Sequence, residues 1–125
     1  MKVLIFDDDT DILELCEIVL EGHGYTVVTS ETCENILDQV ETVKPDVIFM
    51  DNWIPKSGGI IATRLLKSKE AYKKIPVIYF SANNDIKHLA EKAGADAWLA
   101  KPFNIKDLEK VIKEGIENSK SSTII

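Results

Sequence analysis

The chain has few of the residues that mark secreted, membrane-spanning or redox-active proteins. It contains two cysteines among 125 residues, Cys16 and Cys33, and neither belongs to a metal-binding or redox motif, so we expect two structural thiols. No apolar run approaches the roughly 18 residues of a membrane-spanning helix, and the first residues lack the basic and long apolar segments of a signal peptide. These absences predict a cytoplasmic protein with no membrane partner.

Positive charge is also in deficit. Lysine and arginine number 15 against 21 aspartates and glutamates, which gives a formal net charge of -6. Such a chain has no general attraction to nucleic-acid phosphates, so we expect no nucleic-acid binding by this chain alone. With 45% hydrophobic residues, a chain of 125 residues fits one globular domain with a single core.

Short, wholly apolar runs alternate with amphipathic segments from end to end of the chain. The apolar runs predict strands over residues 2–7, 25–30, 46–51, 76–82 and 97–101. The segments with apolar residues at helical spacing predict helices over residues 11–22, 32–44, 60–70, 83–95 and 104–120. Strands that are apolar throughout indicate a parallel sheet covered on both faces. The predicted fold class is therefore α/β, a doubly wound five-stranded parallel sheet in a three-layer sandwich.

The residues with distinctive chemistry follow the predicted strands at their carboxyl ends, where ligand sites form in folds of this kind. They are Asp7, Asp8 and Asp9 after the first strand, Asp51 at the third, Ser81 at the fourth and Lys101 at the fifth. Crowded carboxylates repel one another, and helix capping needs only one of them. Acids at the ends of two strands indicate a cation, and hard oxygen ligands suit Mg²⁺. A lysine and a divalent ion beside acids and a hydroxyl are suited to phosphoryl transfer, with an aspartate as a possible nucleophile.

On these residues the chain resembles the receiver domains of two-component response regulators, such as the chemotaxis regulators. The family's pattern is an acidic pair after the first strand, a phosphorylated aspartate after the third, Ser or Thr before a small residue after the fourth, and Lys-Pro after the fifth. Here the pattern is Asp7-Asp8, Asp51, Ser81-Ala82 and Lys101-Pro102. The resemblance implies a flavodoxin-like fold, with a receiver domain over residues 1–118 and a C-terminal tail over 119–125.

The resemblance also implies a ligand set for Mg²⁺ and a phosphoacceptor. Asp51 would take a phosphoryl group from a phosphohistidine on a histidine kinase or a histidine phosphotransfer domain. Mg²⁺ would be held directly by Asp8, Asp51 and the backbone carbonyl of Trp53, while Asp7 acts through water. The chain would be a signalling domain that catalyses its own phosphorylation and dephosphorylation, rather than a dedicated turnover enzyme.

Other residues receive roles from the same resemblance. Lys101 and the Ser81 hydroxyl would bind phosphoryl oxygens, and Ser81 would move together with Trp98 as a switch. Trp98 stands where the family usually has Tyr, Phe or His. A downstream protein partner would then bind the face made by the fourth helix, the fifth strand and the fifth helix. Asp9 lies outside the implied site, and we expect it to cap the following helix.

Alternatives remain at this point. Asp7 and Asp9 partly resemble the Asp-x-Asp start of haloacid dehalogenase-type phosphatases, in which the first aspartate is the nucleophile. A flavin-binding flavodoxin shares the fold, but three carboxylates after the first strand would repel its phosphate. Within the receiver interpretation, we expect a freestanding single-domain response regulator, with a receiver from a hybrid histidine kinase or a longer regulator as the alternative.

Overall fold

The structure is a computed structural model that describes residues 1–52 and 58–121, in which strands and helices alternate along the chain. The strands are β1 (Lys2–Phe6), β2 (Thr26–Ser30), β3 (Val47–Asp51), β4 (Val77–Ser81) and β5 (Ala97–Ala100). The helices are α1 (Thr10–Gly22), α2 (Ile36–Val43), α3 (Gly59–Lys67), α4 (Ile86–Ala93) and α5 (Ile105–Ser121). The five strands form one sheet in the order β2-β1-β3-β4-β5, and all neighbouring pairs are parallel. The predicted fold class is confirmed.

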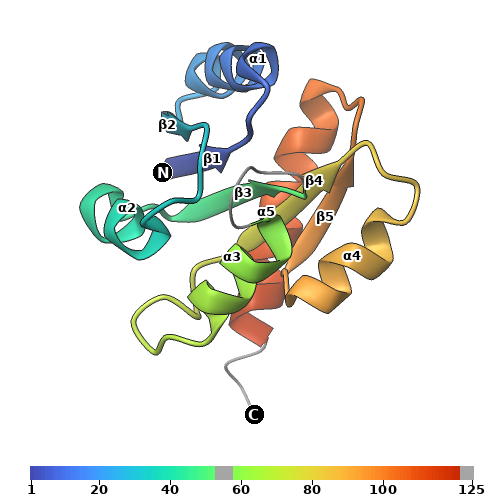
Figure 1. The fold of residues 1–125 in the computed structure, drawn as a ribbon. Coiled ribbons are helices and arrows are strands. Elements are labelled where there is room, and N and C mark those ends of the chain that lie inside the picture. Colours follow the sequence, from blue (N-terminus) through green and yellow to red (C-terminus); the bar gives the residue numbers. More distant parts are fainter. Residues whose placement is uncertain (53–57, 122–125) are drawn as a thin grey trace.

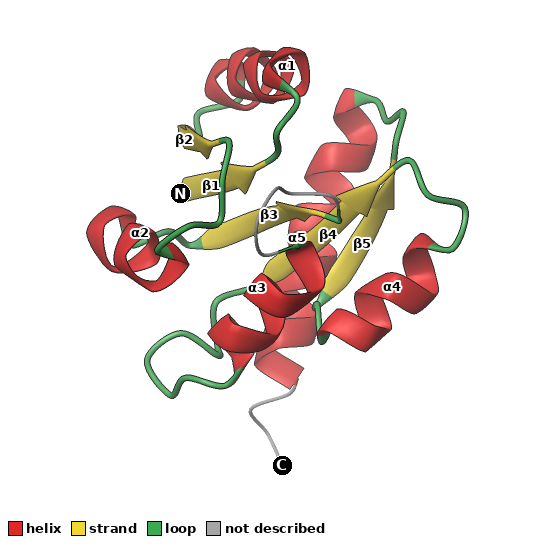
Figure 2. Ribbon diagram, in the orientation of Figure 1, coloured by secondary structure: helices red, strands yellow, loops and turns green. Residues whose placement is uncertain are grey.

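Helices cover both faces of the sheet (Figures 1 and 2). Successive strand residues point to opposite faces, so that Val3 and Ile5 pack beneath α1 and α5 while Leu4 and Phe6 pack beneath α2, α3 and α4. Every residue of β3 and β4 is buried. Burial on both faces explains why these strands are apolar throughout in the sequence.

The two cysteines lie one on each side of the sheet. Cys16 of α1 is in the core beneath α1 and α5, and Cys33 is in the core beneath the other three helices. Both thiols are free, and burial raises the pKa of Cys16 to about 11 and that of Cys33 to about 12. The prediction of structural thiols agrees with this burial, because such thiols stay protonated near neutral pH.

The second helix begins at Ile36, four residues later than the sequence predicts. Local hydrogen bonds hold the preceding residues in turns: the Glu34 N–H donates to the Thr32 hydroxyl at 3.1 Å, and the Gln39 side chain donates to the Glu34 carbonyl at 2.8 Å. Asn35 then takes a left-handed conformation with φ of 55°. Short polar side chains therefore compete with helix formation over this stretch.

Further helix limits differ from the prediction, among them the end of α3 at Lys67 rather than at residue 70. The fourth helix begins at Ile86 rather than at residue 83, because the Asn83 side chain accepts the Asp85 N–H at 2.8 Å in a turn. The last helix runs to Ser121, and Ser119, the predicted start of the tail, is buried with its hydroxyl donating to the Lys74 carbonyl at 2.5 Å. Among the described helices, none has the length and apolar character needed to cross a membrane.

Candidate functional site

Four strand ends bring polar residues to one edge of the sheet. Asp7 directly follows β1, Asp51 ends β3, Ser81 ends β4 and Lys101 directly follows β5. The parallel register pairs Ser81 with Ala100, and the Lys101 N–H donates to the Ser81 carbonyl at 3.0 Å. Residues that are far apart in the sequence therefore share one site, as the strand-end pattern predicts.

The Lys101 ammonium lies between two buried carboxylates. Its Nζ donates to Asp7 Oδ2 at 2.6 Å and to Asp51 Oδ1 at 2.9 Å. The Asp7 and Asp51 side chains are 1% and 8% exposed, and the Lys101 side chain is 15% exposed. Carboxylates this deeply buried need a cation or hydrogen-bond donors, and Lys101 supplies both to each of them.

Lys101 is held in its charged form by these contacts. Burial by itself would lower its pKa, but the hydrogen bonds to Asp7 and Asp51 and the charges of these carboxylates outweigh that effect, so the pKa of Lys101 is raised. Its Nζ also lies 4.6 Å from the centre of the Phe80 ring, within the range of a cation–π contact. The site therefore contains a fixed positive charge.

Asp7, Asp8 and Asp51 form an acidic cluster at the same edge. One carboxylate oxygen from each lies within 4.8 Å of the other two. Asp7 is buried and also accepts the Asp9 N–H at 2.9 Å, whereas Asp8 is exposed. Three hard oxygen donors with an open side for water fit Mg²⁺, which prefers few carboxylates and several waters.

Asp9 does not join this cluster but caps α1, as predicted. Its carboxylate accepts the N–H groups of Asp11 at 3.0 Å and Ile12 at 3.4 Å. The negative charge also lies at the positive end of the helix dipole. The phosphatase interpretation needs Asp7 and Asp9 to act together, and the structure assigns Asp9 to the helix instead.

The two predicted switch residues lie on adjacent strands. Ser81 is 7% exposed, and its Oγ accepts the Asn83 N–H at 3.1 Å, a bond that leaves the hydroxyl proton free to donate elsewhere. Trp98, on β5, is 43% exposed. Trp53, whose backbone carbonyl the resemblance implies as a metal ligand, lies outside the described residues.

The structure contains a polar contact beside Asp51 that the sequence does not predict. The buried hydroxyl of Tyr79 in β4 donates to the side-chain oxygen of Asn52, the residue after Asp51. A tyrosine within an otherwise aliphatic and phenylalanine-containing strand is a weak signal for such a contact, because a buried hydroxyl requires a partner. The sequence does not show which partner it finds.

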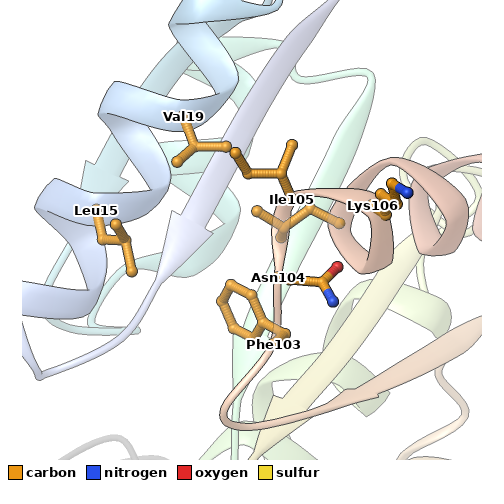
Figure 3. Close-up of a pocket in the computed structure, with 7 residues that line it drawn as sticks. Leu15, Val19, Phe103, Asn104, Ile105 and Lys106 are labelled. Atoms are coloured by element: carbon orange, nitrogen blue, oxygen red, sulfur yellow. The ribbon is translucent and has the colours of Figure 1, made fainter.

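An apolar groove of about 540 Å³ was also missed, and it lies between α1 and the start of α5. Figure 3 shows Leu15 and Val19 of α1 on one side and Phe103 and Ile105 on the other. Leu15 is 50% exposed and Ile105 is 45% exposed. The residues that line the groove include no carboxylate, whereas the acidic cluster lies at the strand ends.

Comparison with protein families gives a match over most of the chain. The model of the response regulator receiver domain matches residues 3–113, which include all the acids of the cluster together with Ser81 and Lys101. The chain therefore belongs to the response regulator receiver domain family. The phosphatase and flavodoxin alternatives are set aside by this match.

Individual relatives show the same domain in proteins of different length. The chain is 32% identical over 120 residues to the alkaline phosphatase synthesis transcriptional regulatory protein PhoP of Bacillus subtilis, covering 94% of this chain and 49% of PhoP. It is 30% identical over 115 residues to protein PilG of Pseudomonas aeruginosa, covering 90% of this chain and 85% of PilG. The chain thus spans about half of the longer regulator and most of the shorter protein.

A solved structure has the same fold along nearly the whole chain. The response regulator receiver domain protein of Clostridium thermocellum superimposes with a TM-score of 0.82 at 28% identity, covering 98% of both chains. The chain is therefore similar over 98% of its length to a response regulator receiver domain protein.

Proposed function

We propose that Asp51 accepts a phosphoryl group from a phosphohistidine on a histidine kinase or a histidine phosphotransfer domain. The observation that carries this proposal is the double contact of the Lys101 ammonium with the buried carboxylates of Asp7 and Asp51, at 2.6 and 2.9 Å. A carboxylate nucleophile beside a fixed cation and a metal-binding acidic cluster supports phosphoryl transfer, whose catalysis is mainly positioning and charge stabilisation.

In the proposed step, a carboxylate oxygen of Asp51 attacks the phosphorus atom of the phosphohistidine. The new O–P bond forms as the P–N bond breaks, and the imidazole leaves with the electron pair of that bond and takes up a proton. The products are an aspartyl phosphate and a neutral histidine. Lys101 then contacts the phosphoryl oxygens in place of the Asp51 carboxylate oxygen that it contacts now.

Mg²⁺, when bound, would offset the negative charge of the phosphoryl oxygens. Asp8 and Asp51 would hold the ion directly, and Asp7 would act through a water molecule. The proximity of the three carboxylates supports this assignment. The proposed backbone ligand at Trp53 stays a prediction.

The proposed output is a change of shape rather than a released product, so we assign the chain as a signalling domain and not as a turnover enzyme. The Ser81 hydroxyl would donate to a phosphoryl oxygen and move toward Asp51, and Trp98 would turn inward into the space beside β4. The surface formed by α4, β5 and α5 would then bind a downstream protein partner. The exposed position of Trp98 supports an unphosphorylated state in which the indole has not yet turned inward. A cytoplasmic, freestanding regulator stays a prediction.

The experiment that tests the proposal is phosphorylation with acetyl phosphate and Mg²⁺. Borohydride reduction followed by mass spectrometry should locate one modified aspartate at Asp51, and Asp51→Asn should show no modification. A modification at Asp7 in place of Asp51 would contradict the proposal. Steady hydrolysis of phosphate monoesters by the unaltered protein would contradict it as well.

A further inference from the structure

Tyr79 carries a hydroxyl into the core directly beside the site. The residue is 0% exposed, and its Cα pairs with that of Met50, the residue before Asp51. A buried hydroxyl without a hydrogen bond costs free energy. The Tyr79 hydroxyl donates to the Asn52 side-chain oxygen, so it reaches past the end of β3 to the residue that follows Asp51.

Gly59, at the start of α3, lies against the same contact between Tyr79 and Asn52. Its N–H donates to the Asn52 carbonyl at 3.2 Å. A Cβ placed on Gly59 would lie 2.2 Å from the Asp51 carbonyl oxygen and 3.0 Å from the Tyr79 hydroxyl oxygen. At Gly59 there is therefore no room for another atom between the Asp51 backbone and the Tyr79 hydroxyl.

The Tyr79 hydroxyl keeps its proton near neutral pH and acts as a hydrogen-bond donor there. Burial raises its pKa well above the ordinary value, and the nearby charge of Asp51 raises it further. The hydroxyl therefore keeps its proton, and the accepting atom is the Asn52 oxygen. The hydrogen bond has one direction and does not depend on titration.

We propose that Tyr79 is a positioning residue for Asp51: its hydroxyl holds Asn52 and so fixes the direction in which the chain presents the Asp51 carboxylate. This inference rests on the proposed role of Asp51. The carboxylate must face Lys101 at 2.9 Å while staying within 4.8 Å of the oxygens of Asp7 and Asp8. Displacements of about 1 Å at such sites are known to cost large factors in rate.

The test compares Tyr79→Phe with Tyr72→Phe. Both variants remove one hydroxyl that forms a hydrogen bond, but the Tyr72 hydroxyl donates to Glu41 at 2.5 Å on an exposed surface. Mg²⁺ alone is titrated and followed by backbone amide NMR shifts, and phosphorylation by acetyl phosphate is measured over a range of Mg²⁺ concentrations. We expect Tyr79→Phe to raise the Mg²⁺ dissociation constant by about three- to tenfold, the range that one hydrogen bond typically supports. Tyr72→Phe should leave it unchanged.

A second variant, Asn52→Ala, removes the acceptor of the hydrogen bond that Tyr79 donates. Its effect on the Mg²⁺ dissociation constant should resemble that of Tyr79→Phe, and the double variant should show no further weakening, because both changes break the same hydrogen bond. Asn52 is only half-buried, so this variant tests the inference even if Tyr79→Phe fails to fold.

Two results would overturn the inference. In the first, Tyr79→Phe lowers the free energy of unfolding but leaves the Mg²⁺ dissociation constant and the Mg²⁺ dependence of phosphorylation unchanged, which would make the hydroxyl a purely structural group. In the second, the effects of Tyr79→Phe and Asn52→Ala add. If the unaltered protein binds Mg²⁺ but is never phosphorylated at Asp51, the proposed function fails, while the titrations still decide whether Tyr79 positions Asp51.

Discussion

Three consecutive aspartates take three different environments, although their side chains are identical. Asp7 is buried against the Lys101 ammonium, Asp8 is exposed within the acidic cluster, and Asp9 caps α1. The end of a strand and the start of a helix follow each other within these few residues, so each side chain points to a different part of the molecule. Substitutions at neighbouring positions should therefore have separable effects.

We predict that Asp8→Ala weakens Mg²⁺ binding while Asp9→Ala does not. Loss of a group that hydrogen-bonds to a metal ligand typically weakens metal affinity about 10- to 100-fold. Loss of Asp8, a proposed direct ligand, should therefore weaken Mg²⁺ affinity roughly tenfold or more. Asp9→Ala should instead lower the free energy of unfolding by about 1 kcal/mol, the usual effect of removing an N-cap. Mg²⁺ titration and urea unfolding of both variants check this. A metal titration of Asp8→Ala that matches the unaltered protein would exclude the proposed ligand.

The residues of the site differ in how far the sequence could predict them. Asp7, Asp51 and Lys101 could be predicted because each stands at the end of an apolar run, and parallel strands bring such ends together. The contact between Tyr79 and Asn52 could not be predicted in this way. It depends on the register of β3 against β4 and on the reach of one buried side chain, neither of which leaves a pattern in the sequence.

At the scale of elements, α3 starts in direct contact with the end of β3. The contact requires a glycine at position 59, because a Cβ there would overlap the Asp51 carbonyl oxygen. This oxygen belongs to the backbone of a fully buried strand, so it cannot move aside in the way that a flexible side chain can. The start of the helix and the end of the strand are therefore fixed together.

We predict that Gly59→Ala destabilises the protein, by about 1–3 kcal/mol if the helix can shift to relieve the overlap. The matched control is Gly22→Ala at the end of α1, where an added Cβ has no neighbour within 4 Å. This control should leave stability unchanged or raise it by up to about 1 kcal/mol. Urea unfolding measures both variants. Equal stability of the two variants would show that α3 can retreat from β3 without cost.

A second prediction at this scale concerns β5 and its neighbours. In a Trp53→Phe background, beryllofluoride bound with Mg²⁺ should lower the acrylamide quenching of Trp98, because the proposed inward turn removes an exposed indole from solvent. A large indole could make the inward state more costly than it is for a smaller ring, so the change should be partial. In Ser81→Ala, this change in quenching should be smaller still. Unchanged quenching at full occupancy of Asp51 would exclude Trp98 as the switch.

The limits of helices were harder to predict than those of strands. Apolar runs define the strands because both faces of the sheet are buried, whereas the start of α2 depends on turns made by Thr32, Glu34 and Asn35. The sequence predicts a helix over 32–44 from an apolar face that begins only at Ile36. Over residues 32–35 the local hydrogen bonds decide instead, since short polar side chains satisfy the backbone in a turn.

At the scale of the whole molecule, stability should depend on the charge of Lys101. Its pKa is raised above the ordinary value of 10.5 in the folded protein, so the folded state holds this proton more tightly than the unfolded state does. The resulting stabilisation is fully present below the ordinary pKa and is lost as the pH rises through the folded pKa.

We therefore predict that the free energy of unfolding falls above about pH 10 more steeply in the unaltered protein than in Lys101→Met. Other lysines titrate in both proteins, so their effects cancel in the comparison. Urea unfolding at a series of pH values measures the two curves. Parallel curves would show that the two carboxylates do not stabilise the ammonium in the folded state.

The contact between Lys101 and Asp7 joins residues that are 94 positions apart in the sequence. During synthesis, both carboxylates leave the ribosome well before β5 and its lysine. A nascent chain that ends before β5 would lack the Lys101 ammonium that contacts Asp7 and Asp51, so its phosphoacceptor site would be incomplete. In the proposed mechanism, phosphorylation by a kinase would therefore require that synthesis has passed β5 and that Lys101 has folded against the two carboxylates.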